Sequence, residues 1–392
     1  MTDISAPSPS RPLIDRLGTI IFALAAAGIV SPFVLFRANR IVAGENKSLL
    51  EVLPGWPGYL VLGVLAAGAL LALVRFDARL RLAISFAALA LLAIGLGWAV
   101  QSVTPADDTI SRTAPALGFW LQMLAFGLLA ADSVVRLGLK PLWRVALLVA
   151  VGLAIAAILL SGIWSDLSVL REYANRADVF WREAATHIAL ALGSLVAAAV
   201  VGLPLGIGIH PTNRVRAVVT GLLSAVQTIP SIALFGLLIA PLAWLAAAVP
   251  AAAAIGIAGI GAAPALLALF LYSLMPVVSN TLAGLDAVPP AANEAARGMG
   301  MTDAERLLQV QLPLAFPSIL AAIRIVLVQN IGLATVAALI GGGGFGVFVF
   351  QGVGQTAMDL VLLGAVPTVA LAFASAVILD AVVELVSVKG RT

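Results

Sequence analysis

Long apolar stretches alternate with short polar ones along this chain. Each apolar stretch has about twenty residues, the length that a helix needs to cross the hydrocarbon core of a bilayer. We expect ten such spans. They lie at roughly 18–36, 56–74, 82–101, 117–135, 145–163, 185–209, 217–240, 263–283, 317–337 and 360–386. The pattern therefore predicts an all-α integral membrane protein.

The composition agrees with a membrane protein and limits its chemistry. Hydrophobic residues make up 62% of the 392 residues and charged residues only 10%, whereas soluble domains carry about a quarter charged residues. The chain has no cysteine, which excludes disulfides and thiolate metal sites. Its two histidines, His187 and His210, are far apart in the sequence and suggest no metal site. We expect no bound cofactor, no metal, no catalytic residue and no nucleic-acid partner.

The basic residues predict an orientation in the membrane. Cytoplasmic loops of membrane proteins carry an excess of Lys and Arg. When both termini are placed inside, most of the 22 basic residues fall in cytoplasmic segments and none needs a place in mid-membrane. We therefore expect a multi-pass protein of the cell inner membrane, surrounded by lipid, with both termini in the cytoplasm.

The polar segments divide the chain into two modules. Residues 1–17 form a polar tail that we expect to be cytoplasmic and disordered, and residues 18–165 form a first module of five spans. A mixed-charge external connection follows at 166–184. Residues 185–392 hold five more spans and the polar motifs, so we expect the function to lie in this second module.

The polar segment 284–316 interrupts the second module and predicts a docking surface for a soluble partner. Asn293 is placed to cap a helix that begins at Glu294, where the helix dipole favours negative charge. Gly298 and Gly300 end that helix and let the backbone turn sharply.

A second short helix is predicted after these glycines. Thr302 and Glu305 have the spacing of a capping box at its start. We expect it to run to about Gln311 and to stop before Pro313, because proline lacks the N–H that a helix interior needs. The segment therefore predicts two short helices joined at a glycine corner, small enough to fit a cleft.

The spacing of residues in this segment carries a family resemblance. The pattern consists of Glu294, Ala295, Ala296, Gly300, Val310, Leu312 and Pro313, with Gly298 inside it. It resembles the signature loop of permease subunits of binding-protein-dependent ABC importers, with Val310 in place of Ile. In that family the loop forms coupling helices that dock into a cytoplasmic ATPase. The resemblance implies three partners: an ABC ATPase dimer that binds ATP and Mg, a second permease subunit (identical or homologous), and a periplasmic substrate-binding protein.

Further stretches of the second module narrow this resemblance. They lie at 226–231, 269–276, 280–281, 294–302, 331–335 and 341–346. They resemble the osmoprotectant permeases, which import glycine betaine, carnitine, choline or related amines. The first module falls outside this core and resembles the extended form of the family, and the Ala/Gly-rich external segment 243–262 departs from the family pattern. A permease for another small solute, such as a sulfonate or amino acid, stays the alternative.

Polar side chains and a proline inside the apolar spans mark candidate pathway residues. These are Gln227, Thr228, Pro230, Ser231, Asn280, Asn330 and Thr335. Such residues either line a cavity or bond neighbouring helices, and the sequence leaves both interpretations open. Aromatic residues are only 6% of the chain, which argues against an aromatic cage for a quaternary ammonium. Selectivity would then rest with a separate binding protein, as the resemblance implies.

Other features fit less specific interpretations. We expect Arg324 to extend its charge to the cytoplasmic boundary and His187 to be a satisfied interfacial histidine. The run 341–346 contains a GxGxxG spacing without a following Lys-Ser/Thr, which favours flexible backbone near the outer gate over a phosphate loop. Ser194 follows His187 on one face, but the motif of a serine hydrolase is missing. A carrier driven by an ion gradient would need midspan carboxylates, and the acidic residues of the second module lie near span ends or in loops.

Overall fold

The computed structural model describes most of the chain and divides it into two compact units. The described residues are 15–39, 42–105, 108 and 110–389. The first unit comprises Met1–Lys140 with Ala150–Arg171, and the second comprises Pro141–Val149 with Glu172–Thr392. The disordered tail predicted for 1–17 lies largely outside the described residues. Within it, Asp15 is buried and helix α1 begins directly after it, so this end of the tail is ordered.

Helices packed side by side make up most of the first unit. They are α1 (Arg16–Val30), α2 (Leu49–Val52), α3 (Trp56–Ala72), α4 (Ala78–Val103), α5 (Leu117–Leu137) and the second half of α6 (Pro141–Leu160). Ile21, Leu65, Leu92 and Phe126 are almost completely buried where α1, α3, α4 and α5 meet. Gly68 lets α3 approach α5 closely, since a Cβ there would lie 2.9 Å from the Phe126 ring.

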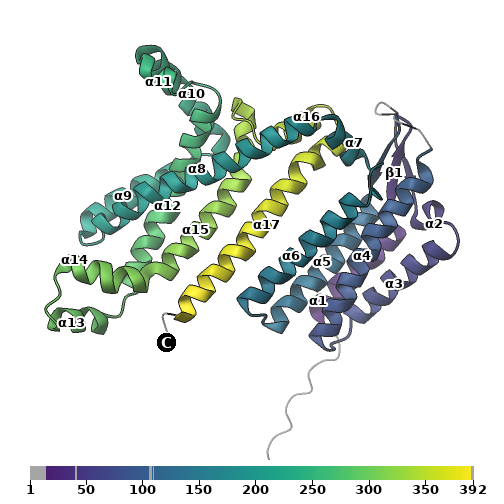
Figure 1. Cartoon of the computed structure of the whole chain (residues 1–392), viewed down its shortest axis with the longest axis horizontal. Helices are drawn as coiled ribbons and strands as arrows, with labels where there is room; N and C mark the ends of the chain where they lie inside the picture. The colour runs from purple at the N-terminus through teal and green to yellow at the C-terminus, as the bar shows by residue number, and fades with distance from the viewer. Residues whose placement is uncertain (1–14, 40–41, 106–107, 109, 390–392) are drawn as a thin grey trace, which may run out of the picture. The chain divides into compact units, whose positions relative to one another are not determined.

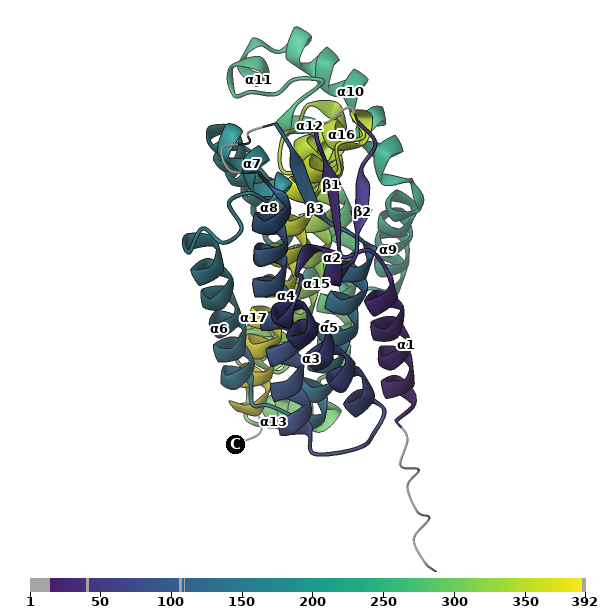
Figure 2. The same cartoon turned by 90° about the vertical axis from the view of Figure 1, so that its right-hand side faces the viewer.

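A small antiparallel sheet at one end of the first unit was not predicted. Its strands are β1 (Val34–Arg37), β2 (Glu45–Lys47) and β3 (Arg112–Pro115), in the order β2-β1-β3 (Figure 2). The predicted span at 18–36 is therefore too long at its end. Helix α1 stops at Val30 because Pro32 disfavours helical backbone in the residue before it, and the β-prone residues that follow pair as a strand.

Four charged side chains, two of them buried, tie the helix ends of the first unit together. Arg81 of α4 is completely buried and contacts the carboxylates of Asp15 at 2.9 Å and Asp132 at 3.3 Å. Arg136 contacts the same two carboxylates at 2.6 and 2.7 Å. Burial by itself would raise the pKa of Asp15, but the Arg136 and Arg81 charges outweigh burial and hold this pKa below its usual value.

The second unit is a bundle of long helices with short ones at both ends (Figure 1). Its helices are the first half of α6, the end of α7 (Ser168–Asn175), then α8 (Ala177–Ile209), α9 (Asn213–Thr228), α10 (Ser231–Ala248), α11 (Pro250–Ala254), α12 (Ala262–Asp286), α13 (Pro290–Gly298), α14 (Asp303–Arg306), α15 (Leu312–Ala334), α16 (Gly346–Gly354) and α17 (Met358–Lys389). A π-helical segment, η1 (Leu307–Gln311), joins α14 to α15, and a 3-10 segment, η2 (Val336–Ile340), follows α15. Helices α8, α12, α15 and α17 pack against one another in that order.

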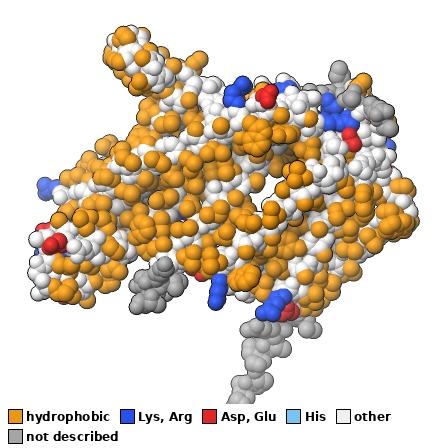
Figure 3. Space-filling view, viewed as in Figure 1, with side chains coloured by type: hydrophobic (Ala, Val, Ile, Leu, Met, Phe, Trp, Pro, Cys, Tyr) orange, Lys and Arg blue, Asp and Glu red, His pale blue; other side chains and the backbone are white. Residues whose placement is uncertain are grey.

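Eight helices in the described part of the chain are long and apolar enough to cross a membrane. They are Ala78–Val103, Leu117–Leu137, Pro141–Leu160, Ala177–Ile209, Ser231–Ala248, Ala262–Asp286, Asp303–Ala334 and Met358–Ser387. Arg16–Val30 and Trp56–Ala72 are shorter apolar helices. Hydrophobic side chains cover the flanks of the helices, and charged ones gather near the helix ends (Figure 3). The chain is an all-α integral membrane protein apart from its small sheet.

The predicted span at 217–240 is wrong, because the helix breaks in its middle. Helix α9 ends at Thr228, and Ile229 has an extended backbone with ψ 126°. Pro230, which has no N–H and disfavours helical backbone in the residue before it, starts the new helix α10. The spanning helix is therefore Ser231–Ala248. The segment 243–262 contains the end of α10, all of α11 and a turn with Gly256 at φ +85°.

Candidate functional site

The segment between α12 and α15 contains the first of the predicted docking helices, although it begins earlier than expected. Helix α13 starts at Pro290, and Pro289 rather than Asn293 is the N-cap residue. A proline is well suited to the first helical position because its N–H would be unpaired there anyway. Glu294 therefore lies inside the helix, where its side chain is exposed. Ala296 is 1% exposed and forms the buried side of α13.

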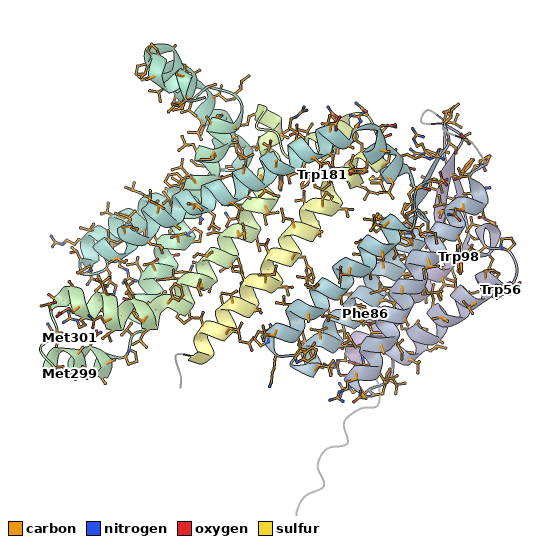
Figure 4. The ribbon with its side chains drawn as sticks, in the orientation of Figure 1. Trp56, Phe86, Trp98, Trp181, Met299 and Met301 are labelled. Carbon is orange, nitrogen blue, oxygen red and sulfur yellow. The ribbon has the colours of Figure 1, made fainter. Side chains whose placement is uncertain are left out.

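A glycine corner ends this helix as predicted. The N–H of Gly300 donates to the carbonyl of Arg297 over 2.9 Å, and that of Met301 donates to Ala296 over 3.2 Å. These two bonds form a Schellman motif, which needs a left-handed residue at its second-last position. Gly300 has φ +82° and fills this position, whereas Gly298 has open space around it and ordinary helical backbone. Met299, at the tip of the corner, is 73% exposed (Figure 4).

The second helix begins with the predicted capping box. The N–H of Glu305 donates to the Thr302 hydroxyl over 3.3 Å, and the N–H of Thr302 donates to the Glu305 carboxylate over 2.8 Å. Arg306 adds an ion pair with Asp303 at 2.8 Å. The start of α14 is therefore fixed by its own side chains.

The predicted end of this helix before Pro313 is wrong. Helix α14 continues through η1 into α15, so that Asp303–Ala334 is one helix. The N–H of Leu312 bonds to the carbonyl of Leu307, five residues back. This wider turn places Pro313 at the start of the next regular stretch, where its missing N–H costs little. Val310 and Leu312 are half-buried on this helix and Pro313 is exposed.

Two contacts connect the corner to the helices of the bundle. The Gln311 amide donates to the side-chain oxygen of Asn293 over 2.9 Å, which joins α13 to η1. Leu307 and Leu312 pack against the buried side chains of Leu285 and Ile319. Asn293 thus connects two helices rather than capping one, and neither contact follows from local sequence spacing.

A charged cluster holds the end of α12, just before α13. The Asp286 carboxylate accepts hydrogen bonds from Arg216 of α9 at 2.7 and 3.2 Å. It also lies 3.1 Å from Nε2 of His210, in the turn between α8 and α9. The same helix end that leads to the corner is therefore fixed to α8 and α9.

Of the pathway candidates, Gln227, Thr228, Pro230 and Ser231 lie together at the break between α9 and α10. The Gln227 amide donates to the carbonyl of Tyr272 over 3.0 Å, and the Tyr272 hydroxyl donates to the carbonyl of Ile229. These bonds satisfy a carbonyl that the broken helix would leave free and attach the break to α12. The Thr228 hydroxyl bonds to its own helix at the Ala225 carbonyl.

The other pathway candidates lie elsewhere in the bundle. Asn330 is completely buried and connects α8, α12 and α15, because its amide donates to the hydroxyls of Ser194 and Ser273 over 2.8 Å each. Asn280 donates to the carbonyl of Pro276 over 2.8 Å within α12. Thr335 lies in the turn between α15 and η2. In this conformation Asn330 joins three helices.

Glycines 341–344 form a second corner, between η2 and α16, that the sequence described only as flexible backbone. Gly344 donates its N–H to the Glu183 carboxylate over 2.8 Å, and Phe345 donates to Nδ1 of His187 over 3.3 Å. Gly341, Gly343 and Gly344 all have positive φ. His187 is completely buried within the protein. Glu183 and His187 are four residues apart on α8, a spacing that places both on one helix face. This spacing was the sequence signal from which their shared contact with the glycine corner could have been predicted.

Arg324 has a partner that the sequence did not predict. Its guanidinium, which is about one-third exposed, forms an ion pair with Asp380 of α17. Arg144, in the first turn of α6 and within the second unit, contacts Asp380 at 2.7 Å and also pairs with Glu384. Asp380 therefore joins α15 to α17 through Arg324 and to α6 through Arg144.

A bundle of apolar spans with a polar two-helix corner at one end defines a membrane-embedded subunit of a transport system. The chain belongs to the family of binding-protein-dependent transport system inner membrane components, whose family model matches residues 189–389. A second model, the N-terminal domain of the ABC transporter permease YehY, matches residues 15–170. The chain is therefore a multi-pass inner-membrane transport subunit and not itself an enzyme, and the choice between an importer permease and a gradient-driven carrier is settled.

Three relatives match about half of this chain. The osmoprotectant import permease OsmW of Salmonella typhimurium is 42% identical over 178 residues, 45% of this chain and 76% of that protein. The choline transport permease OpuBB of Bacillus subtilis is 35% identical over 186 residues, 47% of this chain and 78% of that protein. The glycine betaine/carnitine/choline permease OpuCB of the same organism is 34% identical over 204 residues, 52% and 87% respectively.

Among solved structures, the chain is similar to the MetNI methionine ABC transporter in inward-facing conformations. The similarity covers 53% of this chain and 96% of that one at 21% identity, with a TM-score of 0.45.

Proposed function

We propose that this chain is the permease through which an ATP-driven importer moves an osmoprotectant such as glycine betaine across the inner membrane. Relatives that are 34 to 42% identical over about half of this chain carry osmoprotectant, choline or glycine betaine transport in their names. The observation that carries the ATP-driven mechanism is the exposed corner formed by α13, Gly300 and α14.

The corner has the properties of a surface that docks a soluble ATPase dimer. Glu294, Arg297 and Met299 are exposed and offer an acid, a base and a flexible apolar side chain within one helix and its cap. The backbone behind them is fixed by the Schellman motif and the capping box. A corner with a fixed backbone transmits a displacement of the ATPase to the spans, whereas a flexible loop would change its own conformation instead. ATP and Mg bind to the partner in this proposal and not to this chain.

Movement of the ATPase reaches the spans by two routes from the corner. One is the uninterrupted helix Asp303–Ala334, which leaves the corner at its start and continues to the turn before η2. The other is the end of α12, which Asp286 fixes to α8 and α9 through Arg216 and His210. A rigid-body change of the bundle then alternates the access of the pathway.

The orientation in the membrane and the further subunits of the importer follow from this arrangement. The corner lies on the cytoplasmic side, so both termini are cytoplasmic, and the glycine corner at 341–344 faces outward. A second permease subunit completes the pathway, and a periplasmic binding protein delivers the solute. Within this chain we assign the pathway to the break at Pro230, where Gln227, Thr228 and Ser231 gather.

Purification of the tagged chain from native membranes tests this function. Wild type, Glu294→Arg and Asp178→Arg are compared, and co-purifying proteins are identified by mass spectrometry. Asp178 is an exposed acid at the start of α8, far along the chain from the corner, so its reversal controls for charge alone. We expect an ATPase with wild type and Asp178→Arg but not with Glu294→Arg. Absence of an ATPase from the wild-type sample would refute the proposal.

The substrate is tested by competition for uptake in cells that lack other osmolyte importers. Radiolabelled glycine betaine is the substrate, and unlabelled choline, carnitine, an alkyl sulfonate and a neutral amino acid are the competitors. Competition by the quaternary amines alone supports an osmoprotectant permease. Competition by the sulfonate or the amino acid, without the amines, would assign the chain to the alternative solute class.

A further inference from the structure

Helix α9 lies at the edge of the second unit and is held there mainly by α12. None of the residues of α9, all of which the structure describes, is buried. In the middle of the helix, the half-buried side chains of Val219 and Leu223 pack against a buried cluster that includes Val278 and Leu282 of α12. The position of α9 therefore depends on what fixes it to α12 at its two ends.

A forked ion pair fixes the first turn of α9 to the last residue of α12. The Arg216 guanidinium donates to one oxygen of the Asp286 carboxylate over 3.2 Å and to the other over 2.7 Å. Two hydrogen bonds of this kind determine the orientation of the two groups as well as their distance. The connection from Asp286 to α13 is short, since α13 begins at Pro290. This attachment therefore lies directly beside the docking corner.

Tyr272 fixes the other end of α9, where the helix breaks. Its hydroxyl donates to the carbonyl of Ile229, and its own carbonyl accepts the amide of Gln227 over 3.0 Å. The Tyr272 side chain is 6% exposed and belongs to the same buried cluster as Leu234 and Phe235 of α10. One residue of α12 thus contacts the last turn of α9, the break and the first turns of α10.

The two attachments act over a long distance. Tyr272 and Asp286 are fourteen residues apart on α12, which is about 21 Å at 1.5 Å per residue. Because α9 is attached at both ends and packed in the middle, it cannot slide along α12 without breaking one of the attachments. A displacement of α12 therefore moves the break as well.

We propose that α9 and the break at Pro230 move with α12 as one body, and that Asp286 and Tyr272 are the positioning residues that hold them together. This inference rests on the importer function proposed above, in which the corner receives a displacement from the ATPase. The corner shifts the end of α12 at Asp286, and Tyr272 carries the shift to the pathway residues at the break. Tyr272 thus acts on the pathway through the backbone of Ile229 and the amide of Gln227.

Hydrogen exchange of the purified chain in detergent, without any ATPase, tests the attachment at Tyr272. Tyr272→Phe removes one hydroxyl and keeps the ring. We expect the backbone amides of 226–234 to exchange several-fold faster in this variant than in wild type, because the carbonyl of Ile229 loses its partner on α12. Tyr59→Phe is the matched control, since Tyr59 is 64% exposed on α3 in the other unit, and it should exchange as wild type does.

Transport in proteoliposomes that contain the whole importer tests the transmission. The quantity measured is the glycine betaine moved per ATP hydrolysed. Arg216→Asp and Asp286→Arg should each lower this ratio several-fold with the ATPase still bound, and the double variant, which restores the pair with reversed charges, should recover it. Arg214→Asp reverses an exposed charge two residues earlier on α9 and should keep the wild-type ratio. A purely structural role would reduce the amount of folded protein and leave the ratio unchanged.

Tyr272→Phe should lower the same ratio, and it keeps the test valid if the charge variants do not fold. The proposal is overturned if Tyr272→Phe has the exchange and the transport ratio of wild type, or if the reversed pair transports no better than its single variants. Failure of the importer function gives a different result, because no ATPase then co-purifies with wild type. The exchange measurement on the chain alone would still decide whether Tyr272 holds the break to α12.

Discussion

The buried carboxylate of Glu183 accepts a hydrogen bond of 2.8 Å from the backbone N–H of Gly344. The two residues lie on α8 and on the turn before α16, and His187 accepts the next N–H from Phe345. A side chain at Gly344 would place its Cβ 3.0 Å from Nδ1 of His187. Both the left-handed backbone and the close approach of α8 therefore require glycine here.

We predict that Gly344→Ala destabilises the protein by about 1–2 kcal/mol, because alanine resists positive φ and its methyl group presses on His187. Gly354→Ala is the matched control, since Gly354 has helical backbone and open space around it. Thermal unfolding in detergent should show a lower midpoint for the first variant alone. Equal midpoints for Gly344→Ala and wild type would contradict the requirement for glycine.

A second glycine pair tests the docking corner. Gly300→Ala strains a residue at φ +82° by roughly 1–2 kcal/mol, and it should reduce both ATPase retention and solute uptake several-fold. Gly298→Ala, two residues earlier, meets no neighbouring atom and keeps helical backbone, so it should behave as wild type. If the two variants lose uptake to the same extent, the left-handed backbone at Gly300 is not what the docking corner requires.

Arg81 should be essential to the first unit. Its side chain is completely buried between Asp15 and Asp132, and removal of one partner of a buried ion pair costs about 3–5 kcal/mol. Arg81→Met should therefore unfold the first unit at lower temperature, as measured by proteolysis of residues 15–140. Lys140→Met removes an equal charge from an exposed position at a helix end and should leave protease resistance unchanged.

The same cluster predicts a dependence on pH. The folded-state pKa of Asp15 lies below its ordinary value of 3.8, so its contribution to stability is complete above that value and is lost as the pH falls through the lower, folded-state pKa. Between pH 5 and pH 3, roughly one unit either side of the ordinary value, unfolding should become easier for wild type than for Asp15→Asn relative to each protein at neutral pH. Parallel pH profiles for the two proteins would argue against this role of Asp15.

Asn330 separates the two interpretations of the polar residues in the spans. The hydroxyls of Ser194 and Ser273 also donate to carbonyls of their own helices, so Asn330→Leu leaves them satisfied. Bonds of this kind between membrane helices contribute about 0.6–1.7 kcal/mol. We expect a modest loss of stability and near-normal uptake per folded molecule, measured in proteoliposomes. A large loss of uptake at unchanged stability would assign Asn330 to the pathway instead.

The sequence predicted most of what depends on residues close together in the chain. Apolar length identified the spanning helices, and the spacing of Thr302 and Glu305 identified a capping box that the structure confirms. The start of α13 was misassigned because Asn293 has a strong capping tendency and its actual partner, Gln311, is in another helix. Local patterns contain no information about such partners.

Two prolines, Pro230 and Pro313, also show that local sequence patterns do not decide where a helix ends. Each proline carries the same local signal, yet one ends a helix and the other does not. Tyr272 supplies a hydroxyl to the carbonyl at the first break, and a π-turn rearranges the backbone before the second. The surroundings decide between these outcomes, as they do for Glu183 and the glycine corner.

The helix Asp303–Ala334 has 32 residues, so at about 1.5 Å per residue it is roughly 48 Å long. A bilayer core of about 30 Å cannot contain all of it, and a substantial part must stand outside the hydrocarbon. Had Pro313 ended the helix, a joint would separate the outer part from the inner part. Without that joint the two parts tilt as one body, and a tilt of about ten degrees would move one end by roughly 8 Å relative to the other. The π-turn therefore determines the leverage available to a partner that binds outside the membrane.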